Sequence, residues 1–572
     1  MNTGDRWWEA AADGSARFSQ AALPIGGLGA LLRVRCVATG GVWGRVGRWY
    51  GGAPMDRLLR PAAALAVAAT IPFAAACGGG SGGDPSADPA AIVPARAAVY
   101  IEANLKPGDD VTELAKKLSG EDDPGGAIKS AIEKEARETD KDFKYADDIE
   151  PWLGDKVGIF LPRVQVNGDS PAGLVAPTKD ADKAKEFLER ELRSEGEDGE
   201  KPQVVERTHR DTKYLVDTSD DEGVAIVDDY AVFGSDAAIK GALDAQDGES
   251  LAESSEYEKA RDAVKDDRVG FMYVRLSQIF SSLGQQGAAA RQVFSGLGET
   301  IAVGLDGDPS SIRVESAALG TEGGGGATSP GKVLADLPAS AWLAAGVSDV
   351  GGRIDKAIEQ FSQLGALGGQ NPEQLLDQRE ARLGIDPRRD LAAWLGDVGI
   401  FAFGDSPTEI GGGLVATTKD AGATRRSIPR IARFLEQAAD VRSRPLSRGG
   451  IDTGVTLQSP GLPLPVHMAL TDDERFIVVV TDAALAQTLQ KTDALGDSKP
   501  FQDASGKLGE GLEPSLFVNF GPLAALVEAS GAGGGGESAD RAKKALERLT
   551  TLVAGAKQEG DTTRGRVVVG VK

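Results

Sequence analysis

Apolar residues recur along this chain in runs of strand length, separated by stretches whose apolar residues have helical spacing. Residues 157–161 and 173–176 are apolar runs bounded by polar residues and glycine, which is typical of buried strands. Asp180 then precedes a stretch in which Ala184 and Leu188 fall on one face. This spacing predicts a helix with Asp180 as its N-cap.

The same pattern assigns the neighbouring elements. Asp148 is expected to cap a single helical turn whose Ile149, Trp152 and Leu153 share one face. The other predicted elements are strand 97–103, helix 111–118, strands 213–217 and 224–234, helices 237–243 and 254–264, strand 269–275, and a hairpin of 301–305 with 312–318. Because many strands follow one another directly, we predict an α+β fold with a largely antiparallel sheet rather than a doubly wound fold.

The chain contains the same series of segments twice. Residues 148–155, Asp-Ile-Glu-Pro-Trp-Leu-Gly-Asp, recur at 390–397 as Asp-Leu-Ala-Ala-Trp-Leu-Gly-Asp. Residues 173–180, Gly-Leu-Val-Ala-Pro-Thr-Lys-Asp, recur at 413–420 with Thr in place of Pro. We therefore predict two homologous tandem domains, each a largely antiparallel sheet with packed helices.

The predicted domains span residues 92–320 and 332–572, with a Gly-rich linker at 321–331. A flexible linker between similar domains would let them enclose a cleft. Pro429 falls in the second copy of the helix that follows Asp180, so that helix is expected to be kinked or to start later.

Residues 55–76 have the charge pattern of a cleavable signal, with two arginines before an uncharged apolar run. The run ends in three alanines before Cys77, which resembles the lipobox of bacterial lipoproteins. We expect a lipidated Cys77, a flexible tether over 77–91, and residence on the outer face of the cytoplasmic membrane. Residues 1–54 are interpreted as a mis-annotated N-terminal extension, with a genuine cytoplasmic tail as the alternative.

Charge and residue counts exclude several classes of partner and site. Residues 77–572 carry 82 acidic and 55 basic side chains, so nucleic acid is a poor partner and anionic lipid is not attracted by charge. The only histidines, His209 and His467, are expected to be exposed, and no His/Cys metal site is possible. The segment from Gly326 to Lys332 has the spacing of a phosphate-binding loop but is followed by Val333, so we expect no nucleotide and no cofactor.

The repeated motifs supply the candidate site residues, which are Trp152, Asp155, Lys179, Trp394, Asp397 and Lys419. They could line a ligand site, or each Trp could anchor a core while the Gly-Asp makes a turn and the final Asp caps a helix. The structural interpretation is favoured because it needs no partner.

Together with the lipobox, these Trp-Leu-Gly-Asp and Gly-Leu-Val-Ala-x-Thr-Lys-Asp segments resemble the bacterial domain-of-unknown-function 3352 family. The resemblance implies a secreted or membrane-attached, largely actinobacterial protein, and it brings no catalytic residues. We expect a lipid-anchored binding or envelope-structural protein that is not an enzyme, with an unknown extracytoplasmic ligand or envelope protein as partner. The alternatives are a carrier of a lipid or other hydrophobic ligand, and a carboxylate-dependent hydrolase.

Overall fold

The computed structural model describes residue 84 and residues 86–572, apart from 138–141, 166–169, 195–200, 265–267, 285–286, 289–290, 292–294, 322–329, 368–383, 439–440, 460–461, 491–492 and 530–536. The predicted extension, the signal and Cys77 lie outside the described residues, as does most of the predicted linker.

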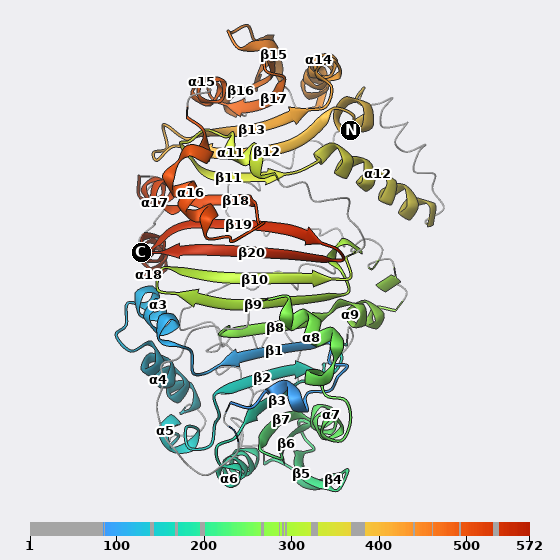
Figure 1. The fold of residues 1–572 in the computed structure, drawn as a ribbon, viewed down its shortest axis with the longest axis vertical. Coiled ribbons are helices and arrows are strands. Elements are labelled where there is room, and N and C mark those ends of the chain that lie inside the picture. Colours follow the sequence, from blue (N-terminus) through green and yellow to red (C-terminus); the bar gives the residue numbers. More distant parts are fainter. Residues whose placement is uncertain are drawn as a thin grey trace, which may run out of the picture. The chain divides into compact units, whose positions relative to one another are not determined.

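The strands form one sheet of 20 strands in the described part of the chain, and all of their pairings are antiparallel (Figure 1). Its first half runs in the order β4 (Val204–His209), β5 (Thr212–Asp217), β6 (Glu222–Val227), β7 (Tyr230–Ser235), β3 (Gly173–Pro177), β2 (Lys156–Leu161), β1 (Val99–Asn104), β8 (Gly270–Arg275), β9 (Thr300–Asp308) and β10 (Ser311–Leu319). The predicted combination of helices with a largely antiparallel sheet is confirmed.

The second half continues from the far edge of β10. Its order is β20 (Thr562–Val571), β19 (Leu549–Glu559), β18 (Pro514–Asn519), β11 (Ala341–Val347), β12 (Leu395–Phe403), β13 (Gly411–Thr418), β17 (Arg475–Val480), β16 (Leu462–Thr471), β15 (Ile451–Ser459) and β14 (Arg442–Pro445). Counted outward from the β10–β20 pair, the strands of the two halves follow the same order, so that β9 corresponds to β19 and β8 to β18. Along β10 and β20 the halves are joined by strand pairing from Ser311 to Leu319, where a cleft was predicted.

Helices cover the two faces of this sheet differently. Face 1, defined by the strand residues Tyr100, Phe271 and Phe517, is buried in both halves. Its covering elements are η2 (Pro89–Ile92), α7 (Asp236–Gln246), α8 (Ser255–Asp262), α11 (Gly331–Ala335), α15 (Asp482–Leu489) and α16 (Lys499–Gly506). Side chains from these helices complete two apolar cores.

Face 2 carries the alternate residues of the same strands, and its two cores lie toward the ends of the sheet. One packs beneath α4 (Pro124–Ala136), α5 (Tyr145–Asp148) and α6 (Ala181–Leu192), and the other beneath α12 (Val350–Leu367) and α14 (Ala421–Ala438). Among the described residues, neither core includes a side chain from β8, β9, β10, β20, β19, β18 or β11. The centre of face 2 is therefore covered only in part.

Several predicted elements are confirmed with small changes of length. Asp180 is the N-cap of α6 and accepts a hydrogen bond from the amide of Lys183, because its carboxylate satisfies a donor of the first turn. The predicted hairpin is β9 with β10, and its second copy is β19 with β20.

Other predicted elements are wrong in detail. The predicted strand 224–234 is two strands, because Asp228 adopts a φ of 50° and turns the chain between β6 and β7. Asp148 ends α5 rather than capping the following turn. Helix α14 begins directly after Asp420 and continues through Pro429, so of the two predicted alternatives the later start is wrong. Strand β4 was not predicted as an element.

Candidate functional site

The first Trp motif is packed into the core of face 2. The Trp152 ring is buried, lies 5.7 Å from the Phe187 ring, and donates from Nε1 to the carbonyl oxygen of Asp148 at 2.6 Å. The Asp148 carboxylate accepts from the Lys144 amide and from Arg190 Nη2, the latter at 2.7 Å. These contacts tie the end of α5 to α6.

The second motif repeats the arrangement with deeper burial. Trp394 Nε1 donates to the carbonyl oxygen of Asp390 at 2.7 Å, and Asp390 is fully buried. Its carboxylate contacts the guanidinium groups of Arg389 and Arg430, which hold the pKa of Asp390 at about 2. Both motifs thus have the contacts of a structural anchor.

The other candidate residues of the motifs have different partners in the two halves. In the second half, Asp397 and Lys419 both contact Asp349: Asp397 accepts from its backbone amide, and Lys419 Nζ pairs with its carboxylate at 2.6 Å. In the first half, Asp155 lies 3.9 Å from Lys106 Nζ. The Lys179 amide donates to the Trp152 carbonyl, as the Lys419 amide does to Trp394.

The two histidines differ in burial. His209 is half-buried and contacts Asp244 at 2.8 Å. His467 is 3% exposed, so its predicted exposure is wrong. Its Nδ1 lies 3.0 Å from Thr456 Oγ1 and its Nε2 lies 3.2 Å from Asp482. Burial lowers its pKa, because the charged imidazolium is less well solvated in the core.

The acidic hairpin between β5 and β6 has buried carboxylates. Asp217 and Glu222 are buried at its two ends. Asp217 accepts from the Gln203 amide and from the amide and hydroxyl of Ser219. Its carboxylate therefore stabilises the turn, since three local donors satisfy it.

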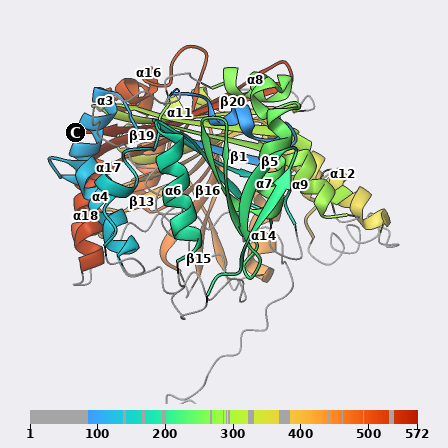
Figure 2. The same cartoon turned by 90° about the horizontal axis from the view of Figure 1, so that it is seen from below.

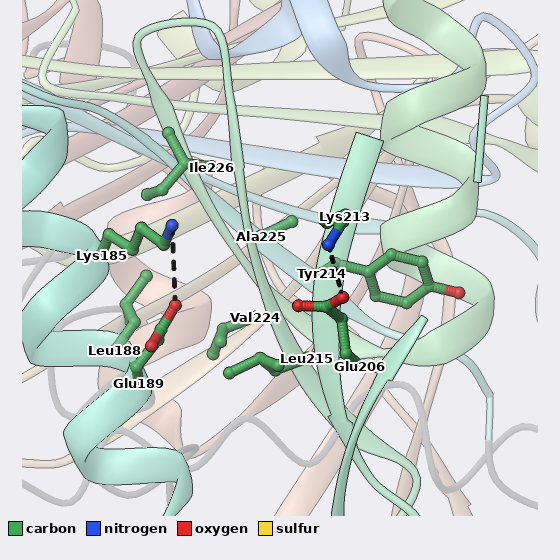
Figure 3. A pocket seen from close by; sticks show the side chains of 10 residues that line it. All are labelled: Lys185, Leu188, Glu189, Glu206, Lys213, Tyr214, Leu215, Val224, Ala225 and Ile226. Carbon is green, nitrogen blue, oxygen red and sulfur yellow. Dashed lines mark hydrogen bonds and ion pairs between the residues drawn. The ribbon is translucent and has the colours of Figure 1, made fainter. Parts of the chain in front are cut away.

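A small cavity lies on face 2 between α6 and strands β4–β6 (Figure 3). Its volume is about 150 Å³, and its apolar wall is made by Leu188, Leu215, Val224 and Ile226. Two ion pairs flank it, Lys185 with Glu189 and Lys213 with Glu206. A cavity of this size holds one small apolar group and is below the usual range for a drug-sized ligand.

Two further cavities are more polar. One of about 260 Å³ lies in the second half and is lined by Asp336, Asp473 and Arg475 among others. The other, of about 140 Å³, lies on face 1 at the junction and includes Glu315 and Arg566, whose side chains pair at 2.8 Å. In each cavity an arginine of the lining pairs with a carboxylate. Arg475 pairs with Asp473 in the first, and Arg566 pairs with Glu315 in the second.

Apolar side chains also line the centre of face 2. Register pairs connect one row of residues across eleven strands, and a parallel row runs beside it from β2 to β19. The first row is Val157, Ala103, Gly270, Leu305, Val314, Val567, Ala554, Leu516, Ala345, Ile400 and Leu414; the second is Ile159, Ile101, Met272, Val303, Ser316, Gly565 and Ala556. We call these two rows the apolar strip.

The apolar strip is covered at its first end and partly open along its centre. Val157 and Ala103 are each 3% exposed and belong to the core around Trp152. Ile101 is 42% exposed and Ile400 is 49% exposed. Between them, Met272, Leu305 and Val567 are half-buried. Leaving apolar surface in water costs about 25 cal/mol per Å², so exposed aliphatic side chains on one face of a sheet are a candidate interaction surface.

Helices stand at both ends of the strands that form the strip. Figure 2 shows α3 (Asp109–Ser119), α17 (Phe520–Ala529) and α18 (Glu537–Arg548) on one side and α9 (Leu276–Ser282) with α12 on the other. Leu114 of α3 reaches the Cα of Gly307 on face 2. The strip therefore runs between two groups of helices.

Sequence reasoning did not find this surface, although a signal was present. Strands such as β8, Gly-Phe-Met-Tyr-Val-Arg, are apolar at both alternate sets of positions. Such a strand must be covered on both faces or expose one of them. Only the register across the whole sheet shows that the second set forms one surface.

Among the described residues, no group of three or more His, Cys, Asp or Glu side chains is placed to hold a metal ion. The helices of that part of the chain are too short or too polar to span a bilayer. Neither observation supplies a ligand.

Comparisons with known proteins give a family and no activity. The family described as "Protein of unknown function (DUF3352)" matches residues 62–570. No curated protein matches the chain. A solved structure described as crystal form III of TP0453 is 11% identical, with a TM-score of 0.22, over 41% of this chain and 81% of that chain. The family match includes both halves of the sheet.

Proposed function

The chain belongs to the DUF3352 family of proteins of unknown function, and we propose that it is a lipid-anchored, extracytoplasmic protein that carries a hydrophobic ligand on the apolar strip. The observation that carries this proposal is the partial exposure of a row of aliphatic side chains along the centre of face 2. Burying one large aliphatic side chain is worth about 1.5–3 kcal/mol, so a ligand covering a few of them binds well.

The proposed duplication agrees with this role. Both halves use the same strand order, and each places its Trp-Asp-Arg anchor outside the apolar strip. The Trp, Asp and Lys residues of the motifs are thus assigned to stability. Nothing in their geometry favours a hydrolase, since Asp155 and Asp397 have separate partners.

The proposed anchor is Cys77, which precedes the first described residue, Asp84, by seven positions. A diacylglyceryl group there would hold the carrier at a membrane, where acyl chains are available. The bacterial, actinobacterial and lipoprotein character of the family members is part of this proposal.

Charged substitutions on the apolar strip are expected to weaken ligand binding. In Ile101→Lys and Ile400→Lys, binding of the apolar dye N-phenylnaphthylamine should fall at least tenfold, because each change puts a charge on the binding surface. Fluorescence titration of the purified chain measures this. Val205→Lys is the matched control, since Val205 is 40% exposed on β4 but faces the other way. Unchanged dye affinity in both strip variants would contradict the proposal.

Membrane attachment is expected to depend on Cys77. Cys77→Ala should move the protein from the membrane fraction to the soluble fraction, because the strongly negative net charge of the chain does not favour anionic lipid in place of the acyl group. Fractionation and intact-mass analysis of the N-terminal peptide measure this. Full membrane retention of Cys77→Ala, or a native N-terminal peptide from residues 1–54, would rule out the proposed anchor or the proposed start.

A further inference from the structure

We propose that the apolar strip is a single track for a long acyl chain, which lies across the β10–β20 junction and contacts both halves at once. This inference rests on the proposed function and adds the class of ligand and its path. The path is set by the register at the junction, where Val314 faces Val567 and Ser316 faces Gly565.

Among the described strand residues at the junction, none that faces the strip is charged. The neighbouring pair, Glu315 with Arg566, lies on face 1, because adjacent residues of a strand point to opposite faces. On face 2 the strip continues from Leu305 through Val314 and Val567 to Ala554, all of them half-buried. Only the hydroxyl of Ser316 is polar in the two rows. An apolar chain thus meets no desolvation barrier between the halves.

The dimensions fit a chain that spans both halves. Neighbouring strands lie about 4.8 Å apart, so the four strands from β9 to β19 cover about 14 Å across the junction. One leaflet of a bilayer core is about 15 Å thick, which sets the scale of an ordered acyl chain. A chain centred on the junction must therefore touch β9 or β10 and also β20 or β19.

The strip favours an acyl chain over a peptide. A peptide that adds to a sheet needs a free strand edge for its backbone hydrogen bonds. Every strand at the strip is paired on both sides, as β10 is with β9 and β20. The strip also offers almost no side-chain hydrogen bonds, and it runs between the helices at the strand ends (Figure 2). A flexible chain without polar groups meets these conditions.

Photolabelling tests the path. Palmitic acid with a diazirine at mid-chain is bound to the full mature chain and irradiated, and singly labelled molecules are digested and mapped. We expect labelled peptides from β9–β10 and from β19–β20. Labelling confined to one half would overturn the inference and leave the carrier proposal standing. Absence of saturable labelling would refute both.

Variants at the junction give a second test. Val567→Asp is expected to weaken palmitate binding at least tenfold, and Val205→Asp to leave it unchanged. Ala556→Asp serves as a milder variant, because Ala556 is already exposed beside Gly565 and a charge there need not disturb the fold. If both junction variants bind palmitate normally while Ile400→Lys does not, the track does not cross the junction.

Discussion

Trp394→Ala is expected to lower the free energy of unfolding by about 3–5 kcal/mol, because it removes a fully buried indole and leaves a cavity. The ring lies 5.0 Å from Phe476, and its Nε1–H satisfies the carbonyl of Asp390. Urea unfolding followed by far-UV circular dichroism at neutral pH measures the change. Trp152→Ala should have an effect of similar size, because Trp152 holds the same position in the first half.

A conservative replacement separates packing from the hydrogen bond. Trp394→Phe keeps most of the ring area and loses the donor to Asp390, so a loss of about 1–2 kcal/mol is expected. If Trp394→Ala costs less than Trp394→Phe, or if neither changes stability, the indole is not a core anchor.

Asp390→Asn is the second change with a large expected effect, about 2–3 kcal/mol of unfolding free energy. It removes a fully buried carboxylate that accepts charge-assisted hydrogen bonds from Arg389 and Arg430, whose guanidinium groups both reach solvent. Asp148→Asn is the matched control. The Asp148 side chain is 17% exposed, against 0% for Asp390, so solvent screens its pair with Arg190 and about 1 kcal/mol is expected.

The pH dependence of this effect has a definite sign. The folded chain holds the pKa of Asp390 at about 2, below the value near 3.9 of an unfolded Asp. The ionised carboxylate therefore stabilises the fold fully above about pH 4, and this contribution of about 2 kcal/mol is lost as pH falls through 2. The difference between wild type and Asp390→Asn should shrink over that range. A difference that stays constant down to pH 2 would contradict the assignment.

The sequence predicted the elements whose capping residues and apolar spacing agree with the tertiary packing around them. Asp180 caps α6 as predicted, because a short polar side chain before an amphipathic stretch has one stable local arrangement. Helix α14 shows the limit of such signals. Its Pro429 lies among buried residues such as Ile428 and Ala432, and their packing holds the helix through the proline. Local helix propensity does not include the contribution of that packing.

The candidate site depended on information that local patterns do not contain. The repeated Trp residues were correctly singled out as shared positions, and their contacts are those of anchors. The apolar strip was not predicted, because the pairing register of strands far apart in sequence forms it. Val314, for example, pairs with Val567, which is 253 positions later in the sequence. Burial of Asp217 and Glu222 was missed for a similar reason, since both look like members of a polar turn.

Glu315 and Arg566 pair at a point of local symmetry between the two halves. Each is the fifth residue of the second strand of its own hairpin, so the two occupy corresponding places and face each other at the middle of the junction. In a dimer of identical halves joined along this edge, a twofold axis would pass through that point and each residue would meet its own copy. Two glutamates or two arginines would then repel each other across the pair. Opposite charges at this point require the two halves to differ in sequence there, so a symmetric dimer of either half alone would lose this ion pair at its junction.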